Sequence, residues 1–199
     1  MAIRAVLFDL GGVLAHETDQ VTALVDTLGL DLEAVRASYW QYRPDYDWGR
    51  STDVQYWSAV AGRTLDERRA TQLASEDSAR WMRIRPAARA ILAELSDAGV
   101  PRFVLSNAQA PIQAAIDAAE WRHLVDGRFV SGQLRLAKPE AAIYRHVEDA
   151  LELSGAELAF IDDRPANLEV PVELGWQTHL WRDDADTRDW LVGLGLLPA

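Results

Sequence analysis

The chain has 199 residues, of which 49% are hydrophobic, and a formal net charge of −11. This length fits one α/β domain with a small insert better than two full domains, and the charge argues against nucleic acid or an anionic membrane as a partner. The absence of cysteine excludes disulfides, thiolate metal sites and cysteine nucleophiles. With no apolar run of about 18 residues and no export signal in residues 1–8, we expect a cytoplasmic protein that does not span a membrane.

The first predicted element is a buried strand at residues 3–8, followed by Asp9 and the glycines Gly11 and Gly12. Glycines permit a tight turn in which backbone N–H groups face an anion. A carboxylate at this place can act as a nucleophile, a metal ligand or both. The alternative for this segment taken alone is a helix-capping Asp.

Residues 18–83 differ from the rest of the chain. They combine helical periodicity with many charges and aromatics, and they contain no convincing strand. We therefore predict an α-helical insert at 18–83 within a core formed by residues 1–17 and 84–199. Trp48 and Trp57 either line a sugar-binding face, because aromatic rings stack on sugar rings, or form the insert's own core.

Beyond the insert, predicted helices alternate with predicted strands. The strands are expected at 102–105, 128–131, 158–161 and 177–181, and the helices at 86–98, 111–119, 139–153, 165–174 and 184–194. This alternation predicts an α/β, Rossmann-like fold with a parallel sheet. Ligands of such sheets bind beyond the carboxyl ends of the strands.

Polar residues follow two of these predicted strands, as Asp9 follows the first. Ser106 and Asn107 could donate hydrogen bonds to phosphate oxygens, or they could form an ordinary turn. The adjacent carboxylates Asp162 and Asp163 repel each other unless a cation or proton intervenes. Such oxygen ligands suit Mg²⁺, which also bridges to phosphate.

Lys138 is the single lysine among 20 basic residues. A compact ammonium fits beside groups that a wide guanidinium cannot approach. Pro139 begins the helix that follows, so Lys138 is expected at its mouth, where it could neutralise a phosphate and Asp9 together. The alternative is an ordinary surface lysine.

Four segments, at residues 8–14, 105–107, 138–140 and 160–167, resemble in order the four motifs of the haloacid dehalogenase-like hydrolases. The helical insert resembles the α-helical cap of that family. In detail the chain looks most like the branch that holds small sugar-phosphate phosphatases and the phosphatase-like domain of epoxide hydrolases.

The resemblance implies a Mg²⁺-dependent phosphatase that acts on a small phosphate monoester such as a sugar phosphate. Asp9 would attack phosphorus to form an aspartyl-phosphate. Asp9, the carbonyl of Gly11 and Asp163 would bind Mg²⁺, with Asp162 as a second ligand or orienter, and Asn167 would support the metal loop. The phosphoryl group would be bound by Ser106, Asn107, Lys138, Gly11 and Gly12. The resemblance leaves open a monomer or a homodimer.

One position departs from the family pattern. Most phosphatases of the family carry a second Asp two residues after the nucleophile, as general acid and base, and here that residue is Gly11. Our hypothesis is that a water, His16, or a carboxylate of the insert such as Asp45 or Asp47 replaces it.

Two alternatives remain open. A metal-independent 2-haloacid dehalogenase would use Asp9 to displace halide from carbon, but that branch typically has Tyr at the position of Gly11 and lacks the acidic pair Asp162-Asp163. A non-catalytic binding or regulatory protein on the same fold would have no need to keep Asp9, Lys138 and the acidic pair together.

Overall fold

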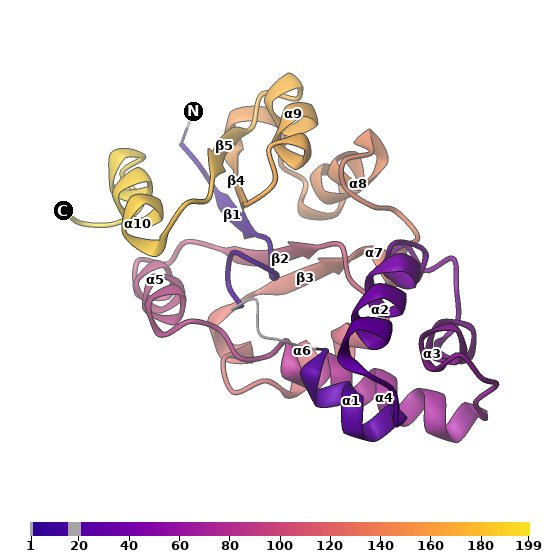
Figure 1. Ribbon diagram of the computed structural model, residues 1–199. Coiled ribbons are helices and arrows are strands. Elements are labelled where there is room, and N and C mark those ends of the chain that lie inside the picture. The colour runs from indigo at the N-terminus through magenta and orange to yellow at the C-terminus, as the bar shows by residue number, and fades with distance from the viewer. Residues whose placement is uncertain (1, 16–20) are drawn as a thin grey trace.

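The computed structural model describes residues 2–15 and 21–199, and its centre is a five-stranded sheet (Figure 1). The strands are β1 (Ala5–Phe8), β2 (Arg102–Ser106), β3 (Gly127–Val130), β4 (Leu158–Asp162) and β5 (Gln177–Leu180). They lie in the order β3-β2-β1-β4-β5, and every neighbouring pair is parallel. The predicted α/β fold with a parallel sheet is confirmed.

Helices cover both faces of the sheet. They are α5 (Pro86–Asp97), α6 (Ile112–Ala118), α7 (Ser131–Leu134), α8 (Ala141–Leu151), α9 (Ala166–Glu173) and α10 (Asp184–Gly193), with short 3₁₀ turns at Arg122–Leu124 and Gly155–Glu157. Side chains alternate along a strand. Val6 and Phe8 therefore pack with α5, α6 and α10, whereas Ala5 and Leu7 pack with α8 and α9 on the other face. Figure 1 shows α5 and α10 well apart from α8 and α9.

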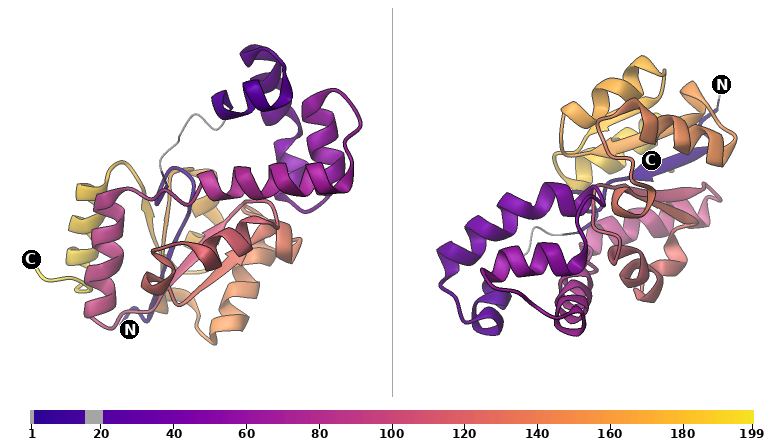
Figure 2. Two further views of the ribbon diagram at one scale, coloured as in Figure 1. Left: turned by 90° about the horizontal axis from the view of Figure 1, so that it is seen from below. Right: turned by 90° about the vertical axis from the view of Figure 1, so that its right-hand side faces the viewer.

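The segment between β1 and α5 forms a helical insert, comprising α1 (Thr22–Leu28), α2 (Leu32–Asp47), α3 (Asp53–Ala61) and α4 (Glu67–Arg80). These helices gather at one end of the molecule (Figure 2) and enclose a hydrophobic cluster of their own, which includes Tyr39, Tyr56 and Trp57. The boundaries between core and insert stay predictions. Within the described residues, no helix is both long enough and apolar enough to cross a bilayer.

The sheet order places the expected site residues side by side. β1 lies between β2 and β4, with Phe8 level with Val104 on one side and Ile161 on the other. The residues that end or follow these three strands therefore meet at the carboxyl edge, where the strand order reverses. One local expectation was wrong: Ser131 was predicted to end a strand but begins α7.

Candidate active site

Asp9 and Lys138 form an ion pair at the carboxyl edge of the sheet. Oδ1 of Asp9 accepts hydrogen bonds from the backbone N–H of Leu10 at 2.7 Å and lies 3.2 Å from Nζ of Lys138. The ammonium also donates to Oδ2 of Asp162 at 2.6 Å and to the carbonyl of Leu105 at 2.9 Å. An ammonium has three donors, so these three acceptors satisfy Lys138, whose side chain is only 1% exposed.

Asn107 holds the backbone of Lys138 in place. Its Nδ2 donates to the carbonyl of Lys138 at 2.7 Å, and its Oδ1 accepts from the N–H of Lys138 at 2.9 Å. Ser106 is buried and, like Asn107, lines the cavity above Asp9. Two of the residues that were expected to bind phosphate thus differ: the amide of Asn107 is engaged by the backbone of Lys138, and Ser106 is a buried part of the cavity wall.

The two residues of the acidic pair, Asp162 and Asp163, also differ in their hydrogen bonds. Asp162 is fully buried; its Oδ1 accepts from the N–H of Arg164 at 2.8 Å and from Nδ2 of Asn167 at 2.9 Å, while Oδ2 is bound by Lys138. Asp163 is half-buried, and its Oδ1 has no hydrogen-bond partner among the described residues. These contacts favour an orienting role for Asp162 and leave Asp163 open to a ligand.

Gly12 makes the close approach of Asp163 possible. A Cβ atom on Gly12 would lie 2.6 Å from Oδ2 of Asp163, which is closer than side chains tolerate, and the φ of Gly12 is +77°. Glycine therefore lets the loop after β1 pack directly against the carboxylate of Asp163.

Carboxylates outnumber ammonium groups at this point of the structure. Ligand atoms of Asp9, Asp162 and Asp163 all lie within 4.8 Å of one another, and Asp9 and Asp162 share the ammonium of Lys138. Burial raises the pKa of Asp9 to about 6, against the opposing effect of Lys138, and burial also raises the pKa of Asp163. A hard divalent cation with oxygen ligands would balance this excess of negative charge.

Arg85, which sequence reasoning missed, binds backbone carbonyls of the loop after β1. Its guanidinium donates to the carbonyls of Gly12, at 3.2 Å, and of Val13. The same group is paired with Asp184 at 2.7 Å and lies over the ring of Trp181. The signal in the sequence was weak, since Arg85 is one of many arginines and lies just before the predicted helix at 86–98.

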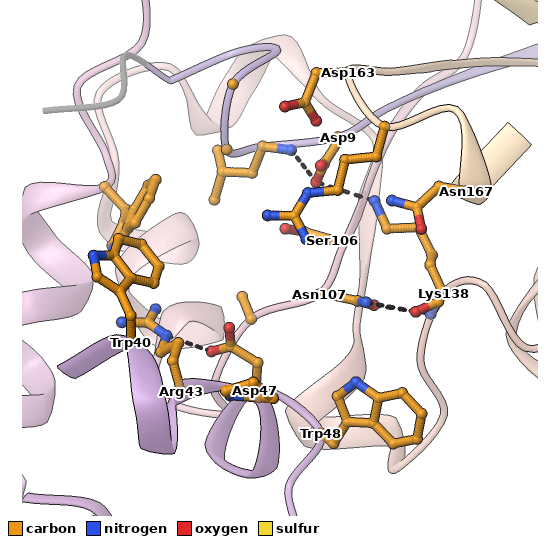
Figure 3. Close-up of a pocket in the computed structure, with 17 residues that line it drawn as sticks. Asp9, Trp40, Arg43, Asp47, Trp48, Ser106, Asn107, Lys138, Asp163 and Asn167 are labelled. Carbon is orange, nitrogen blue, oxygen red and sulfur yellow. Dashed lines mark hydrogen bonds and ion pairs between the residues drawn. The ribbon is translucent and has the colours of Figure 1, made fainter. Parts of the chain in front are cut away.

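A cavity of about 240 Å³ lies between the sheet edge and the helical insert (Figure 3). This volume is below the range of roughly 300–1,000 Å³ that is usual for ligand pockets, so the cavity suits a small ligand. The core contributes Asp9, Leu10, Gly11, Gly12, Ser106, Asn107, Ala108, Lys138, Asp163, Arg164 and Asn167, and the segment 40–81 contributes Trp40, Arg43, Pro44, Asp47, Trp48 and Trp81.

Of the groups considered as a substitute for the missing acid, Asp47 lines the cavity. Its side chain is 17% exposed and accepts a hydrogen bond from Nε of Arg43 at 2.7 Å. Burial raises its pKa to about 6. The side chain of Asp45 is 71% exposed, pairs with Arg50 at 3.7 Å and does not line the cavity. His16 lies outside the described residues.

Trp48 and Trp57, the two tryptophans considered in the insert, lie in different surroundings. Trp48 lines the cavity, with the guanidinium of Arg50 over its ring at 3.8 Å. Trp57 is fully buried in the insert's own hydrophobic cluster, which was the second of its two readings. Trp40 and Trp81 are further cavity residues that sequence reasoning did not select, because helical periodicity alone does not show which aromatics face the core domain.

Comparison with known proteins agrees with this geometry. The family model described as haloacid dehalogenase-like hydrolase matches residues 3–175. The chain belongs to the haloacid dehalogenase-like hydrolase family. It is a hydrolase, as the four motifs predicted.

Relatives within this family point to two chemistries. The chain is 26% identical to (S)-2-haloacid dehalogenase 4A of Burkholderia cepacia over 89% of this chain and 82% of that protein. It is 36% identical to the sesquiterpene phosphatase astK of Aspergillus oryzae, but over only 46% of this chain and 48% of that protein. A magnesium complex of the HAD family enzyme bt-2542 from Bacteroides thetaiotaomicron has the same fold, with a TM-score of 0.70 and 18% identity over 92% of this chain and 94% of that one.

Proposed function

We propose that this hydrolase is a Mg²⁺-dependent phosphatase that cleaves a small phosphate monoester through an aspartyl-phosphate on Asp9. The observation that carries the proposal is the carboxylate of Asp163, whose Oδ1 has no hydrogen-bond partner among the described residues and which lies beside Asp9. A cation would stabilise a buried oxygen that has no hydrogen-bond partner and lies in a cluster with excess negative charge.

Asp9 would act as the nucleophile. Among the described residues, the N–H of Leu10 and the ammonium of Lys138 both act on Oδ1, so Oδ2 is the oxygen placed to attack phosphorus. Lys138 would keep Asp9 ionised and neutralise charge on the transferring phosphoryl group, and Ser106 would donate to one of its oxygens. Phosphoryl transfer depends mainly on positioning and charge neutralisation, which this set of residues supplies.

The residues present fit a magnesium ion. Asp9, Asp163 and the carbonyl of Gly11 would hold it, and Asp162 would orient the site through Lys138 and Asn167. When bound, the ion supplies charge neutralisation for the phosphate oxygens. Gly12 gives Asp163 the room to take this position, because any side chain there would collide with its carboxylate.

The comparisons support this choice without deciding it. The structural neighbour bt-2542 forms a magnesium complex, and the partial relative astK is a sesquiterpene phosphatase. We expect the substrate to be a small phosphorylated molecule, in keeping with a cavity of about 240 Å³, and the protein to work in the cytoplasm.

The second candidate is a metal-independent 2-haloacid dehalogenase. The observation that favours it is the similarity of (S)-2-haloacid dehalogenase 4A over most of both chains. In that reaction Asp9 would attack carbon and displace halide. The unpaired carboxylate oxygen of Asp163 beside Asp9 would then have no role, which is why we rank this candidate second.

One paired assay separates the two candidates. The wild-type chain is incubated with p-nitrophenyl phosphate and, separately, with 2-chloropropionate, each with Mg²⁺ and with EDTA, and the Asp9→Asn variant is the blank. Phosphate release that requires Mg²⁺ supports the phosphatase. Chloride release in EDTA without phosphate release would replace it with the dehalogenase, and inactivity toward both, at substrate concentrations that saturate relatives, would contradict both.

A further inference from the structure

The proposed reaction needs a proton donor, and among the described residues the usual position for it in the family's phosphatases carries no side chain. When Asp9 attacks phosphorus, the ester oxygen departs as an alkoxide unless it receives a proton. The position two residues after Asp9 is Gly11, which has no side chain. A donor among the described residues must therefore lie elsewhere in the cavity wall.

In-line displacement fixes where that donor must lie. The attacking and leaving oxygens are roughly collinear through phosphorus, so the leaving oxygen points away from Asp9 toward the helical insert. Figure 3 shows Asp9 on the sheet side of the cavity and the carboxylate of Asp47 pointing into it from α2 on the opposite side. Of the described residues that line the cavity, only Asp9, Asp47 and Asp163 carry a carboxyl group, and no histidine lines it.

The end of α2 that carries Asp47 is anchored to the core. The hydroxyl of Ser131 donates to the carbonyl of Asp47 and accepts from the N–H of Ala108 at 2.9 Å. Next to it, a Cβ on Gly49 would lie 2.5 Å from the carbonyl of Gly132, so the two backbones are in direct contact. These contacts fix the backbone at Asp47 relative to the core.

A hydrogen bond from Arg43 orients the side chain of Asp47. Nε of Arg43 donates to its Oδ1 at 2.7 Å. Arg43 is itself fixed, because its Nη1 donates to Asp77 at 3.1 Å and to the hydroxyl of Tyr39, and its Nη2 donates to Oε1 of Gln109. This network crosses from the insert to the loop after β2 and places one carboxylate edge of Asp47 against Arg43.

We propose that Asp47 is the acid and base of this hydrolase, in place of the missing second Asp of the family; the inference rests on the proposed phosphatase function. Oδ2 of Asp9 bonds to phosphorus as the bond between phosphorus and the leaving oxygen breaks. The carboxyl proton of Asp47 passes to that leaving oxygen, which departs as an alcohol. Asp47, now a carboxylate, then accepts a proton from the water that attacks the aspartyl-phosphate. Phosphate leaves, and Asp9 and Asp47 return to their starting states.

The surroundings of Asp47 suit both roles. The charged groups facing it are Arg43 from its own helix and Asp77 from α4; the loop after β2 adds the backbone of Gln109, and α7 contributes the neutral hydroxyl of Ser131. Burial raises the pKa of Asp47 to about 6 and outweighs the lowering effect of Arg43. A carboxyl group that titrates near the working pH can give a proton in one step and take it back in the next.

The test compares two esters that differ by one nitro group, which changes how much the leaving oxygen needs an acid. Phenyl phosphate has a leaving oxygen that needs a proton, whereas p-nitrophenolate leaves readily without one. We expect Asp47→Asn to lower kcat/KM for phenyl phosphate by about 10²–10⁴-fold, and to change kcat/KM for p-nitrophenyl phosphate by less than about tenfold. The ratio kcat/KM reports the step in which Asp9 is phosphorylated, so a slower second step does not confuse the comparison.

Asp45→Asn is the matched control, because Asp45 lies on the same helix with an exposed side chain that does not line the cavity. This variant should leave kcat/KM unchanged for both esters. Equal losses for the two esters in Asp47→Asn, as misfolding of α2 would produce, or no loss with either, would overturn the role of Asp47 and leave the phosphatase function standing. A wild-type chain that releases phosphate from neither ester would contradict the proposed function itself.

Discussion

Nζ of Lys138 lies 3.2 Å from Oδ1 of Asp9, inside a site where both side chains are almost completely buried. The two residues come from opposite halves of the chain, and the parallel sheet brings them together at its carboxyl edge. Lys138 is shared with Asp162, so one ammonium stabilises two carboxylates while Asp163 adds a third. The site is therefore held in a state of excess negative charge by the fold around it.

This charge excess gives the metal-free protein a pH-dependent stability. Burial raises the pKa of Asp9 to about 6 in the folded chain, whereas the unfolded value is near 3.8. The folded state then binds the proton more tightly, so the contribution of Asp9 is favourable below pH 4 and is lost as pH rises through about 6. The loss amounts to at most about 3 kcal/mol.

Asp9→Asn removes this dependence. In EDTA, the Tm of the variant should exceed the wild-type Tm at pH 7.5 by several degrees, and the difference should shrink toward pH 4.5. The measurement is a pair of thermal melts at each pH. A variant that is less stable than wild type at pH 7.5 would show that Lys138 outweighs the burial of Asp9.

The two residues of the acidic pair should behave differently when substituted. Asp162→Asn breaks a fully buried ion pair with Lys138 and should lower the free energy of unfolding by about 3–5 kcal/mol. Asp163→Asn removes no hydrogen bond from Oδ1, so it should change stability by less than about 1 kcal/mol. It should nevertheless weaken Mg²⁺ binding at least about tenfold.

Denaturant titration and Mg²⁺-dependent activity measure these two effects separately. If Asp162→Asn weakened Mg²⁺ binding while Asp163→Asn left it intact, the roles of the pair would be the reverse of those assigned from their hydrogen bonds.

Gly12→Ala tests the contact between the loop after β1 and Asp163. The new Cβ would meet Oδ2 of Asp163 at 2.6 Å and would have to displace it, so the activity should require a much higher Mg²⁺ concentration. Gly62→Ala is the matched control: Gly62 has a similar φ of +62°, but nothing lies within 4 Å of its Cβ position. Both variants should lose about 1–2 kcal/mol from backbone strain.

Only Gly12→Ala should change the Mg²⁺ dependence. The readout is the Mg²⁺ concentration that gives half-maximal phosphate release, and equal values for the two variants would contradict the assigned position of Asp163.

The sequence alone predicted the sheet and the charged centre for clear physical reasons. Apolar runs ended by Asp9, Ser106 and Asp162 indicated strands whose carboxyl ends meet, and the single lysine stood out against 19 arginines, which is the total of 20 basic residues less Lys138. These signals are local in the chain, and the parallel topology converts them into a site.

The contacts between insert and core could not be predicted in the same way. Asp45 and Asp47 both lie near the end of one charged helix, and only its docking against Ser131 and Gly132 turns Asp47 into the cavity. Arg43 likewise looks like a solvated helix residue until α4 and the loop after β2 surround it. Burial of a charged side chain in a helix depends on which neighbours pack against it, and no local pattern encodes that.

Acid-quench mass spectrometry of the protein during turnover of p-nitrophenyl phosphate with Mg²⁺ would detect the aspartyl-phosphate on Asp9 itself. We expect one added phosphoryl group on the peptide that contains Asp9, absent in EDTA and absent in the Asp9→Asn variant. A phosphoryl group on another residue, or phosphate release by the Asp9→Asn variant at the wild-type rate, would contradict this expectation.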